Sequence, residues 1–402
     1  MNKSKIDGTF KENKNISIHR WYPYVEGFSE NFVLECLKDF EKSSIVYDPF
    51  NGSGTTSTAC AFNGFSCYAS EVNPLMRFIA NTKVNTVKNI IEKNKFSELD
   101  KYKDELINFL NNSNIKCDNL INDCYKDFEF FSKENLSQIN KIKNFIYNIE
   151  DEDISNIFKV ALTSIIVKVS NMTRSTDLRR KTEKELKNVT TKVFEEYIKA
   201  LENVIDDITK HKKSKIKKFE IISDNAKFID SKYDNMVDCI ITSPPYINGT
   251  NYFRNTKLEL WILDYIYSDD DSKKYRMEAI TAGINNVTKE KNEHINKDNI
   301  KEVISEIAKV SPDKRIPKMI DGYFCDMQKV FENFSKILKK KGKIFFDIGD
   351  SQYYNVYVPV YDYIEEIAKD YGLILENTIV LRKRVSKNGM ELSQKLMIFR
   401  KD

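Results

Sequence analysis

Short apolar runs that favour β-strands alternate with helical patterns in two parts of the chain. In the first part, "SIVY" at 44–47 leads into a glycine-rich turn, a helical stretch "TTSTACAFN" that ends before Gly64, and a second apolar run, "SCYAS" at 66–70. In the second part, the apolar runs are "FEIIS", "VDCIIT" and "GKIFFDIGD". Strands that alternate with helices in this way predict an α/β fold with a doubly wound, mostly parallel sheet.

A long helical pattern separates these two parts. Residues from about 91 to 215 contain few Gly and Pro. Their apolar residues recur at helical spacing, as at Ile157, Val160, Ala161, Ile165 and Val169. The pattern predicts a helical insertion at 91–215, which divides the main domain into a first part, 1–90, and a second part, 216–402.

The second part contains one further insert and a terminal hairpin. The stretch from about 268 to 318 holds few large apolar residues, which predicts a polar, loop-rich insert. The chain ends with two apolar runs, "LILENTIVLRKR" and "QKLMIFRK", that are separated by a short polar turn. These runs predict a terminal antiparallel pair of strands.

Composition narrows the class of protein. Of the 402 residues, 41% are hydrophobic and 31% are charged, which is ordinary for a globular protein. No run of about 18 apolar residues occurs, so no transmembrane helix is expected. The N-terminal stretch "MNKSKIDGTFKENKN" lacks the apolar core of a secretory signal, and we therefore predict a cytoplasmic protein.

The cysteines and histidines exclude several kinds of chemistry. The seven cysteines are scattered without a C-x-x-C pair, which is typical of reduced thiols. The three histidines lie far apart in the sequence. We therefore expect no metal site and no Ser-His-Asp catalysis.

The glycine-rich turn "DPFNGSGTT" at 48–56 has the composition of a nucleoside-binding loop. Gly52 and Gly54 allow a tight bend and a close approach of backbone to a ligand, and the N-terminus of a helix follows. Glu71 lies 23 residues after Asp48, at the end of the second strand, where an acid that binds ribose hydroxyls is expected. The turn lacks the G-K-[ST] of a phosphate loop, which disfavours ATP. A tight loop and a solvated strand end are the alternative interpretations.

The segment "TSPPY" at 242–246 interrupts an apolar run. Proline cannot continue a central strand, so the chain leaves the sheet at Ser243. A rigid Ser-Pro-Pro segment offers a hydroxyl and carbonyl oxygens to the N–H groups of an exocyclic amine, and Tyr246 offers a ring on which an extruded base can stack. In this interpretation the ring of Tyr246 matters and its hydroxyl is dispensable. The alternative is a turn that merely ends a strand.

Together, "DPFNGSGTT" and "TSPPY" resemble motifs I and IV of amino-methyltransferases that use S-adenosylmethionine. The resemblance is greatest to DNA cytosine-N4 and adenine-N6 methyltransferases. "SENFVLECLKDF", "ASEVNP" and "SDNA" are similar to motifs X, II and III of that family. The resemblance implies a seven-stranded, Rossmann-like methyltransferase sheet and S-adenosylmethionine as the cofactor.

The resemblance also implies roles for individual residues. Glu71 would bind the ribose hydroxyls of the cofactor, and Asp224 its adenine amine. The full set of implied cofactor-binding residues is Asp48, Pro49, Phe50, Asn51, Gly52, Ser53, Gly54, Thr55, Glu71, Asp224, Asn225 and Thr242. The implied catalytic residues, which would hold the target amine and stack the base, are Ser243, Pro244, Pro245 and Tyr246.

The first residue of the catalytic motif bears on the target base. Ser243, in place of Asp or Asn, is the form usual among cytosine-N4 enzymes, and no Pro-Cys nucleophile for C5 chemistry is present. The resemblance thus implies a site-specific methyltransferase of double-stranded DNA from a restriction–modification system, with a cognate endonuclease as a candidate partner. N6-adenine methylation, N2 methylation of guanine in RNA, and a catalytically silent DNA-binding homologue remain alternatives.

Two polar, basic stretches are candidates for contact with DNA. The first lies within the helical insertion at 91–215, which is therefore a candidate region for DNA binding and target recognition. "SNMTRSTDLRRKTEKEL" at 170–186 clusters Arg174, Arg179, Arg180 and Lys181 around Ser, Thr and Asn, a mixture that suits phosphate groups. "NGTNYFRNTK" at 248–257 follows the catalytic motif. The candidate DNA-binding residues are Arg174, Arg179, Arg180, Lys181, Asn251, Tyr252 and Arg254. A charged helix face for the first stretch, and packing for Tyr252, are the alternative interpretations.

Overall fold

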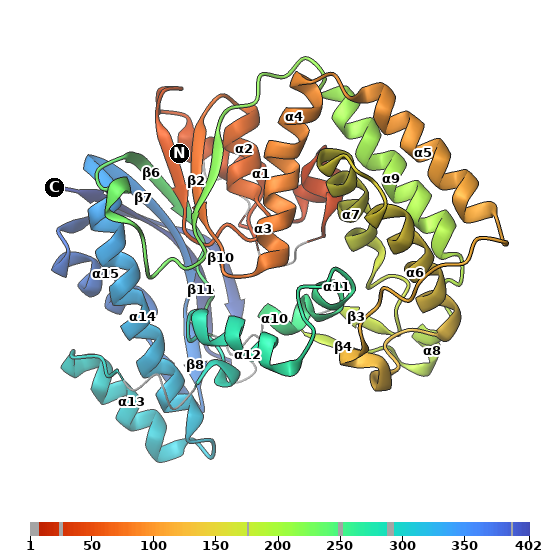
Figure 1. Cartoon of the computed structure of the whole chain (residues 1–402). Coiled ribbons are helices and arrows are strands. Elements are labelled where there is room, and N and C mark those ends of the chain that lie inside the picture. Colours follow the sequence, from red (N-terminus) through yellow and green to blue (C-terminus); the bar gives the residue numbers. More distant parts are fainter. Residues whose placement is uncertain (1–7, 24–26, 175–176, 248–251, 288–292, 387–388) are drawn as a thin grey trace.

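A seven-stranded sheet forms the centre of the computed structural model, which describes residues 8–23, 27–174, 177–247, 252–287, 293–386 and 389–402 (Figure 1). The strand order is β10-β11-β7-β6-β1-β2-β5. Neighbours from β7 to β5 are parallel, and β11 is antiparallel to both β7 and β10. This order confirms the predicted α/β fold class with its seven-stranded, mostly parallel sheet. The strands are β1 (Ile45–Asp48), β2 (Ser66–Ser70), β5 (Phe219–Ser223), β6 (Val237–Thr242), β7 (Leu338–Gly349), β10 (Leu373–Val385) and β11 (Glu391–Lys401).

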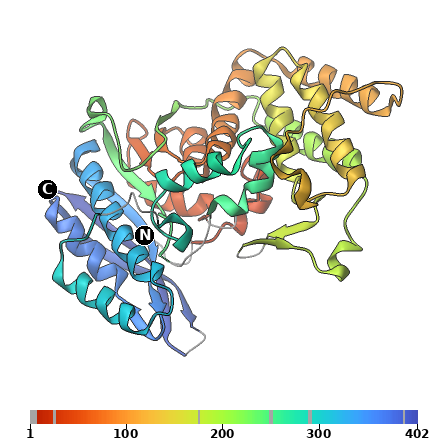
Figure 2. The same ribbon diagram turned by 60° about the horizontal axis from the view of Figure 1, so that its bottom comes forward.

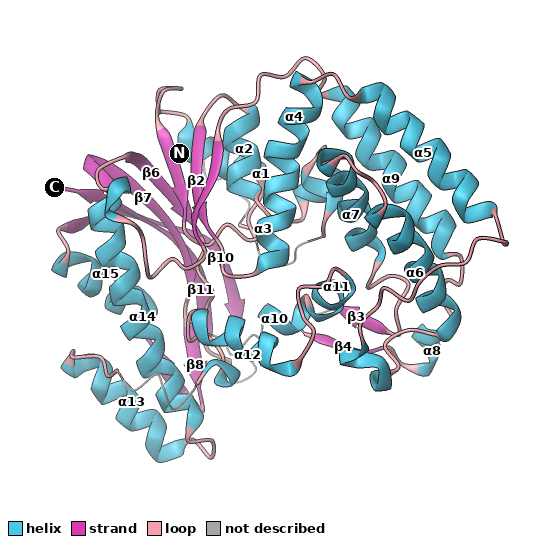
Figure 3. Ribbon diagram, viewed as in Figure 1, coloured by secondary structure: helices cyan, strands magenta, loops and turns pink. Residues whose placement is uncertain are grey.

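The central strands are apolar on both faces because helices cover both faces of the sheet (Figure 3). On β6, Cys239 and Ile241 belong to one hydrophobic cluster and Ile240, between them, belongs to the other. The first cluster includes α1 (Glu30–Leu37), α2 (Thr55–Phe62) and α3 (Pro74–Asn81), and the second includes α14 (Arg315–Ile337) and α15 (Val360–Asp370). A run such as "VDCIIT" therefore has no polar face to turn to water.

The block between 91 and 215 is mainly helical. Its apolar residues join the same hydrophobic cluster as α1–α3. A π-helix, η4 (Thr82–Thr86), links α3 to this block. Its helices are α4 (Val87–Glu92), α5 (Phe96–Asn111), α6 (Lys133–Tyr147), α7 (Glu152–Ile165), α8 (Glu183–Leu186) and α9 (Val193–Lys210), with the 3-10 turn η5 (Asp123–Phe128).

The stretch 170–186 is not the charged helix face considered as an alternative. It forms a small antiparallel hairpin of β3 (Met172–Arg174) and β4 (Leu178–Arg180), followed by α8 (Figure 2). Thr182 and Glu185 form a capping box at the start of α8, so the helical signal begins only after the hairpin.

The N-terminal segment is attached to the helical block through one buried carboxylate. Asp207 on α9 accepts hydrogen bonds from the backbone N–H of Ile18, from the Arg20 guanidinium and from the indole N–H of Trp21, at distances of 2.7–3.2 Å. Burial acts to raise the pKa of Asp207, but these hydrogen bonds prevail and lower it. The turns of this segment are η2 (Glu12–Asn15) and η3 (His19–Trp21).

The prediction of a loop-rich insert at 268–318 is wrong. This stretch contains α12 (Asp269–Glu278), the turn η7 (Ile284–Asn286) and α13 (Asp298–Val310). Helix α13 packs on α14 through a narrow apolar stripe in which Ile300 and Ile307 are buried. A helix that buries only one stripe needs few apolar residues, so its sequence looks polar. The remaining elements are η6 (Ser231–Tyr233), α10 (Tyr252–Asn255), α11 (Lys257–Ile262), β8 (Ser351–Tyr353) and β9 (Val356–Val358).

Among the described helices, none has the length and apolar character needed to cross a bilayer.

Substitution of Gly54 by alanine should destabilise the protein more than the same change at Gly64. Both glycines have left-handed backbone, with φ of 86° and 91°. A Cβ at position 54 would lie 2.8 Å from the Cβ of Ala80 on α3, whereas at position 64 the nearest atom is 3.5 Å away on the flexible Lys42 side chain. For Gly64→Ala, backbone strain should lower the free energy of unfolding by about 1–2 kcal/mol. Gly54→Ala should cost roughly 1–3 kcal/mol more from overpacking. Urea unfolding measures both, and equal losses would contradict the close approach of the loop to α3.

Candidate active site

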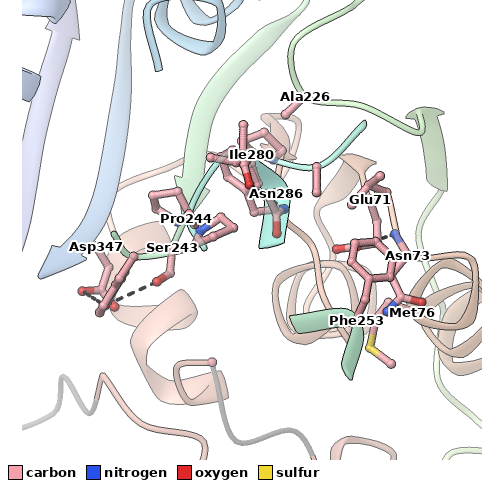
Figure 4. Close-up of a pocket in the computed structure, with 18 of the residues that line it drawn as sticks. Glu71, Asn73, Met76, Ala226, Ser243, Pro244, Phe253, Ile280, Asn286 and Asp347 are labelled. Atoms are coloured by element: carbon pink, nitrogen blue, oxygen red, sulfur yellow. Dashed lines mark hydrogen bonds between the residues drawn. The ribbon is translucent and has the colours of Figure 1, made fainter. Parts of the chain in front are cut away.

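A cavity of about 320 Å³ opens where the chain leaves the carboxyl ends of β1, β2, β5 and β6. The predicted residues that line it are Pro49, Phe50, Glu71, Asn225, Ser243, Pro244, Pro245 and Tyr246. In Figure 4, Ser243 and Pro244 lie on the side of Asp347, and Glu71 lies on the other side with Asn73 and Met76. The structure thus brings the glycine-rich turn and the Ser-Pro-Pro-Tyr segment to one cavity, although almost 190 residues separate them in the sequence.

Asp48 connects the two motifs. Its Oδ1 accepts hydrogen bonds from the backbone N–H of Phe50 at 3.0 Å and from the hydroxyl of Thr242 at 2.7 Å. Its Oδ2 accepts from the hydroxyl of Thr56 at 2.6 Å. Burial raises the pKa of Asp48 to about 6, although these hydrogen bonds act to lower it. Asp48 and Thr242 therefore link β1, α2 and β6 to one another and do not line the cavity.

Glu71 shapes the glycine loop and faces the cavity. Its Oε2 accepts from the backbone N–H of Gly52 and its Oε1 from that of Asn73, both at 2.8 Å. Burial raises the pKa of Glu71 to about 6. A carboxylate has about four lone-pair positions, so two remain for the hydroxyls of a ligand.

The loop itself contains buried polar atoms that lack partners within the described structure. Both amide atoms of Asn51 and the hydroxyl of Ser53 are buried without a hydrogen bond. Unsatisfied buried polar atoms are costly, and at a functional site they mark places where a ligand donates or accepts. The neighbouring Thr55 begins α2, with its hydroxyl 3.5 Å from Nδ2 of Asn13.

Lys83 supports the loop from the protein interior and was not predicted from the sequence. Its fully buried ammonium lies 2.9 Å from the carbonyl oxygen of Ser53 and 3.4 Å from that of His19. Burial lowers the pKa of Lys83 to about 7. The lysine lies in the π-helix η4, a local irregularity of a kind often found at functional sites.

The hydroxyl of Tyr246 has hydrogen-bond partners within the site. It donates to Oδ1 of Asp347 on β7 at 3.1 Å and lies 3.5 Å from the hydroxyl of Ser243 (Figure 4). The Nε2 of Gln394 on β11 donates to both oxygens of Asp347, at 2.9 and 2.8 Å. Burial raises the pKa of Asp347 to about 7, although these hydrogen bonds act to lower it.

Gly349 makes room for the ring of Tyr246. A Cβ at position 349 would lie 3.1 Å from Cδ2 and Cε2 of that ring. The ring is therefore held by Gly349 and Asp347, which are two residues apart on the same strand and so face the same side of it. The sequence indicated neither contact, because about a hundred residues separate β7 from the catalytic segment.

The insert predicted to be a loop forms one wall of the cavity. Thr281 donates to Oδ2 of Asp326 on α14 from its backbone N–H at 2.9 Å and from its hydroxyl at 2.7 Å. Lys227 pairs with the other oxygen of Asp326 at 3.2 Å, and Asn225 donates to the carbonyl of Glu278 at 3.1 Å. The wall residues from this segment are Glu278, Ala279, Ile280, Ala282 and Asn286.

Asp224 and Asn225 differ in their placement. The side chain of Asp224 is 65% exposed and lies 4.0 Å from Arg77, outside the cavity wall. Asn225 lines the cavity. The reason is local, because the hydroxyl of Ser223 bonds to the backbone of Asn225 and Phe228 and folds the chain into a turn after β5.

The candidate DNA-binding residues whose side chains the structure describes do not line the cavity. Arg174 forms an ion pair with the buried Glu259 at 2.5 Å. Glu259 also accepts a hydrogen bond from the hydroxyl of Tyr22. The others are nearer to solvent and contact acids or carbonyls: Arg179 with Glu185, Arg180 with the Phe128 carbonyl, Lys181 with the Ser170 carbonyl and Arg254 with Asp177. Asn251 and the side chain of Tyr252 lie outside the described residues. Within the described residues, no group of three metal-ligating side chains occurs.

Substitution of Asp347 by asparagine should make the protein relatively more stable at high pH. An unfolded Asp has a pKa of about 3.9, and in the folded protein the pKa is raised to about 7. Between these values the folded state binds more protons, so this group makes stability fall as the pH rises from about 4 to 7, by at most about 4 kcal/mol. Asp347→Asn removes that titration. The melting temperature of Asp347→Asn relative to wild type should therefore be higher at pH 8 than at pH 5.

Asp270→Asn, which removes an exposed carboxylate on α12, controls for the change in net charge. If the two variants showed the same pH dependence relative to wild type, Asp347 would be ionised throughout.

Comparison with known proteins gives relatives of one kind, and no family model matches the chain. The chain is 24% identical over 409 residues to the type II methyltransferase M.AvaI of Nostoc sp. (strain PCC 7120), covering 93% of this chain and 82% of that protein. It is 24% identical over 445 residues to the type II methyltransferase M.BsoBI of Geobacillus stearothermophilus, covering 96% and 84%. A solved structure of a SAM-dependent methyltransferase from Methanosarcina mazei covers 91% of this chain at 6% identity with a TM-score of 0.34, so the fold class rests on the sheet order of this chain itself. Over more than nine-tenths of its length, the chain is similar to type II methyltransferases.

Proposed function

We propose that the protein is a site-specific DNA methyltransferase that transfers the methyl group of S-adenosylmethionine to the N4 amine of cytosine in double-stranded DNA. The observation that carries the proposal is the single cavity shared by Glu71 and the segment Ser243–Tyr246. One end of this cavity suits a nucleoside and the other suits an amine. The similarity to type II methyltransferases along almost the whole chain supports a methyltransferase of DNA.

The residues around the glycine loop fit S-adenosylmethionine. Glu71 has lone pairs for the ribose hydroxyls, and Asn225 lies on the wall where an adenine amine would be bound. Asn51 and Ser53, which lie in the same loop behind the cavity lining, have buried polar atoms without partners and are proposed for the methionine part. The cofactor supplies an electrophilic methyl group on a sulfonium. Asp48, Gly54, Thr55 and Thr242 would act indirectly, by fixing the loop.

The Ser-Pro-Pro-Tyr segment suits activation of an exocyclic amine. The lone pair of such an amine is delocalised into the base, and acceptors around its N–H groups return electron density to nitrogen. The hydroxyl of Ser243 and the carbonyl oxygens beside Pro244 and Pro245 supply acceptors, and the prolines lack competing N–H donors. The N–C bond would form as the bond between the methyl carbon and the sulfonium sulfur breaks. The nitrogen would then be cationic and would readily lose a proton to water. No strong base is therefore needed.

The assignment to cytosine N4 rests on Ser243 at the first position of the motif. Adenine N6 has the same amine chemistry and is the alternative that product analysis separates. N2 methylation of guanine in RNA and a silent DNA-binding homologue are the further alternatives. We infer a restriction–modification context, with a cognate endonuclease as partner and the cytoplasm as the place of action.

Among the candidate DNA contacts, we propose that Arg179 and Arg180 on the β3–β4 hairpin contact phosphates. Their side chains are 47% and 58% exposed, so they can exchange their present partners for DNA. Lys181, Arg254, Tyr252 and Asn251 are proposed for the same surface. Arg174 would instead stabilise the hairpin through Glu259, since both are largely buried.

Methyl transfer tests the proposal. Incubation with tritiated S-adenosylmethionine and duplex DNA should label DNA, and nucleoside analysis should yield N4-methylcytosine. Ser243→Ala should reduce turnover roughly 5- to 150-fold, the loss expected for about 1–3 kcal/mol from one hydrogen bond, with cofactor affinity retained. Ser231→Ala, on the exposed turn η6, is the matched control.

Labelling of N6-methyladenine would overturn the cytosine assignment alone. Labelling of transfer RNA in place of DNA, or of neither, would overturn the proposed function.

Substitution of Tyr246 tests base extrusion. Stacking on an aromatic ring contributes about 1–3 kcal/mol per base, comparable with the cost of unstacking. Tyr246→Ala should therefore lower turnover strongly, and a mismatch opposite the target should partly restore it because the base is easier to extrude. Tyr246→Phe should have an intermediate effect, since the ring remains but loses its bond to Asp347. Wild-type turnover of Tyr246→Ala on matched duplex would contradict the stacking role.

A further inference from the structure

The terminal hairpin extends beyond the sheet. Strand β11 pairs with β7 only between Gln394 and Arg400, but with β10 as far as Glu391. Residues 381–385 and 391–393 therefore form a two-stranded arm, which we call the β10–β11 arm. In Figure 2 this hairpin reaches the bottom of the view, past the neighbouring strands.

A β-bulge sets the direction of the side chains on this arm. The pairing shifts between Val380 and Arg382, so that Arg382 lies opposite Gln394 and Arg384 opposite Leu392. Residues directly opposite in an antiparallel pair share one face of the sheet. Gln394 faces the cavity, where it bonds to Asp347, and both arginines line the same cavity. Without the extra residue, the alternation of the strand would turn both arginines to the other face.

The two arginines also differ from most others in their charge environment. Eight described arginines lie within 4.0 Å of a carboxylate: Arg20, Arg77, Arg174, Arg179, Arg180, Arg254, Arg315 and Arg400. Arg384 donates to the carbonyl of Asp350 at 3.2 Å, and neither it nor Arg382 has a carboxylate that close in the described part of the chain. Lys383, between them on the opposite face, is paired with Glu391 at 2.8 Å. The cavity-facing side of the arm thus carries two arginines that have no carboxylate within 4.0 Å among the described residues.

The position of Arg382 and Arg384 indicates which anion they could bind: a DNA phosphate or the carboxylate of the cofactor. Arg382 lies opposite Gln394, which contacts Asp347, the partner of Tyr246. Arg384 contacts Asp350, just past the end of β7. Asp347 and Ser243 lie together on the side of the cavity away from Glu71 (Figure 4). The arginines therefore flank the end of the cavity that would take the target amine. The carboxylate of S-adenosylmethionine, bound near the glycine loop, would lie at the other end.

We propose that Arg382 and Arg384 bind phosphates of the DNA strand that carries the target nucleotide. The inference rests on the proposed function and extends it to a surface that the predicted DNA contacts do not include. When a base is extruded, its flanking phosphates stay at the mouth of the pocket. Residues two apart on a strand are about 7 Å apart, which suits neighbouring phosphates on one strand. Exposed guanidinium groups can bind phosphate oxygens bidentately with little desolvation.

The test measures DNA binding against salt with the full chain and a duplex that the wild-type protein methylates. Each phosphate contact contributes about 0.9 to the slope of log affinity against log salt concentration. The double variant Arg382→Gln/Arg384→Gln should therefore lose about 1.8 from that slope. Its affinity deficit should shrink roughly twelvefold between 50 and 200 mM salt. Lys383→Gln, on the opposite face of the same strand, should keep the wild-type slope, and cofactor affinity and melting temperature should be unchanged in both.

Three results would overturn the inference. The double variant could show the wild-type slope, it could lose affinity for S-adenosylmethionine and keep that for DNA, or it could lose binding to duplex RNA alone. These results are distinguishable from failure of the proposed function, because in that case the wild-type protein itself methylates no duplex.

Discussion

The hydrogen bonds of one buried carboxylate hold the candidate active site together. Asp48 accepts from Phe50, Thr56 and Thr242, and so connects the end of β1, the start of α2 and the end of β6. Two parallel strands pair through backbone groups alone and leave their carboxyl ends to diverge into separate loops. The Asp48 side chain fixes those loops relative to each other. The distance between the glycine-rich turn and the Ser-Pro-Pro-Tyr segment, on which any transfer between them depends, is set at this residue.

Similar polar contacts secure each remaining wall. Glu71 holds the loop at Gly52, Lys83 holds it at Ser53, and Asp347 holds the ring of Tyr246. Burial raises the pKa of Glu71 and Asp347 and lowers that of Lys83, because an apolar environment disfavours the charged form of each group. Perturbed ionisable groups that gather around one cavity are characteristic of functional sites.

The sequence was sufficient where the signal is local. Apolar runs, glycines and prolines predicted the strands of the seven-stranded sheet, both loops and the position of Glu71, but not the short strands β3, β4, β8 and β9. It was insufficient where a residue acquires its role from a distant partner. Asp347 reads as one polar residue within an apolar strand, and only the pairing of β7 with β11 brings it to Gln394. Asp224 and Asn225 are adjacent, and the turn at Ser223 decides which of them faces inward. Helix α13 was missed because its narrow apolar stripe resembles a polar loop.

The position of the helical block also constrains how the chain folds during synthesis. Strand β2 ends at Ser70, yet its edge partner β5 begins at Phe219, after the whole block has been made. Until then β1 and β2 have each other but lack the neighbours that complete the sheet, and two strands alone are marginal in water. Contacts between segments so far apart in sequence form slowly. The helices of the block, whose contacts are local, have time to form before β5 is synthesised.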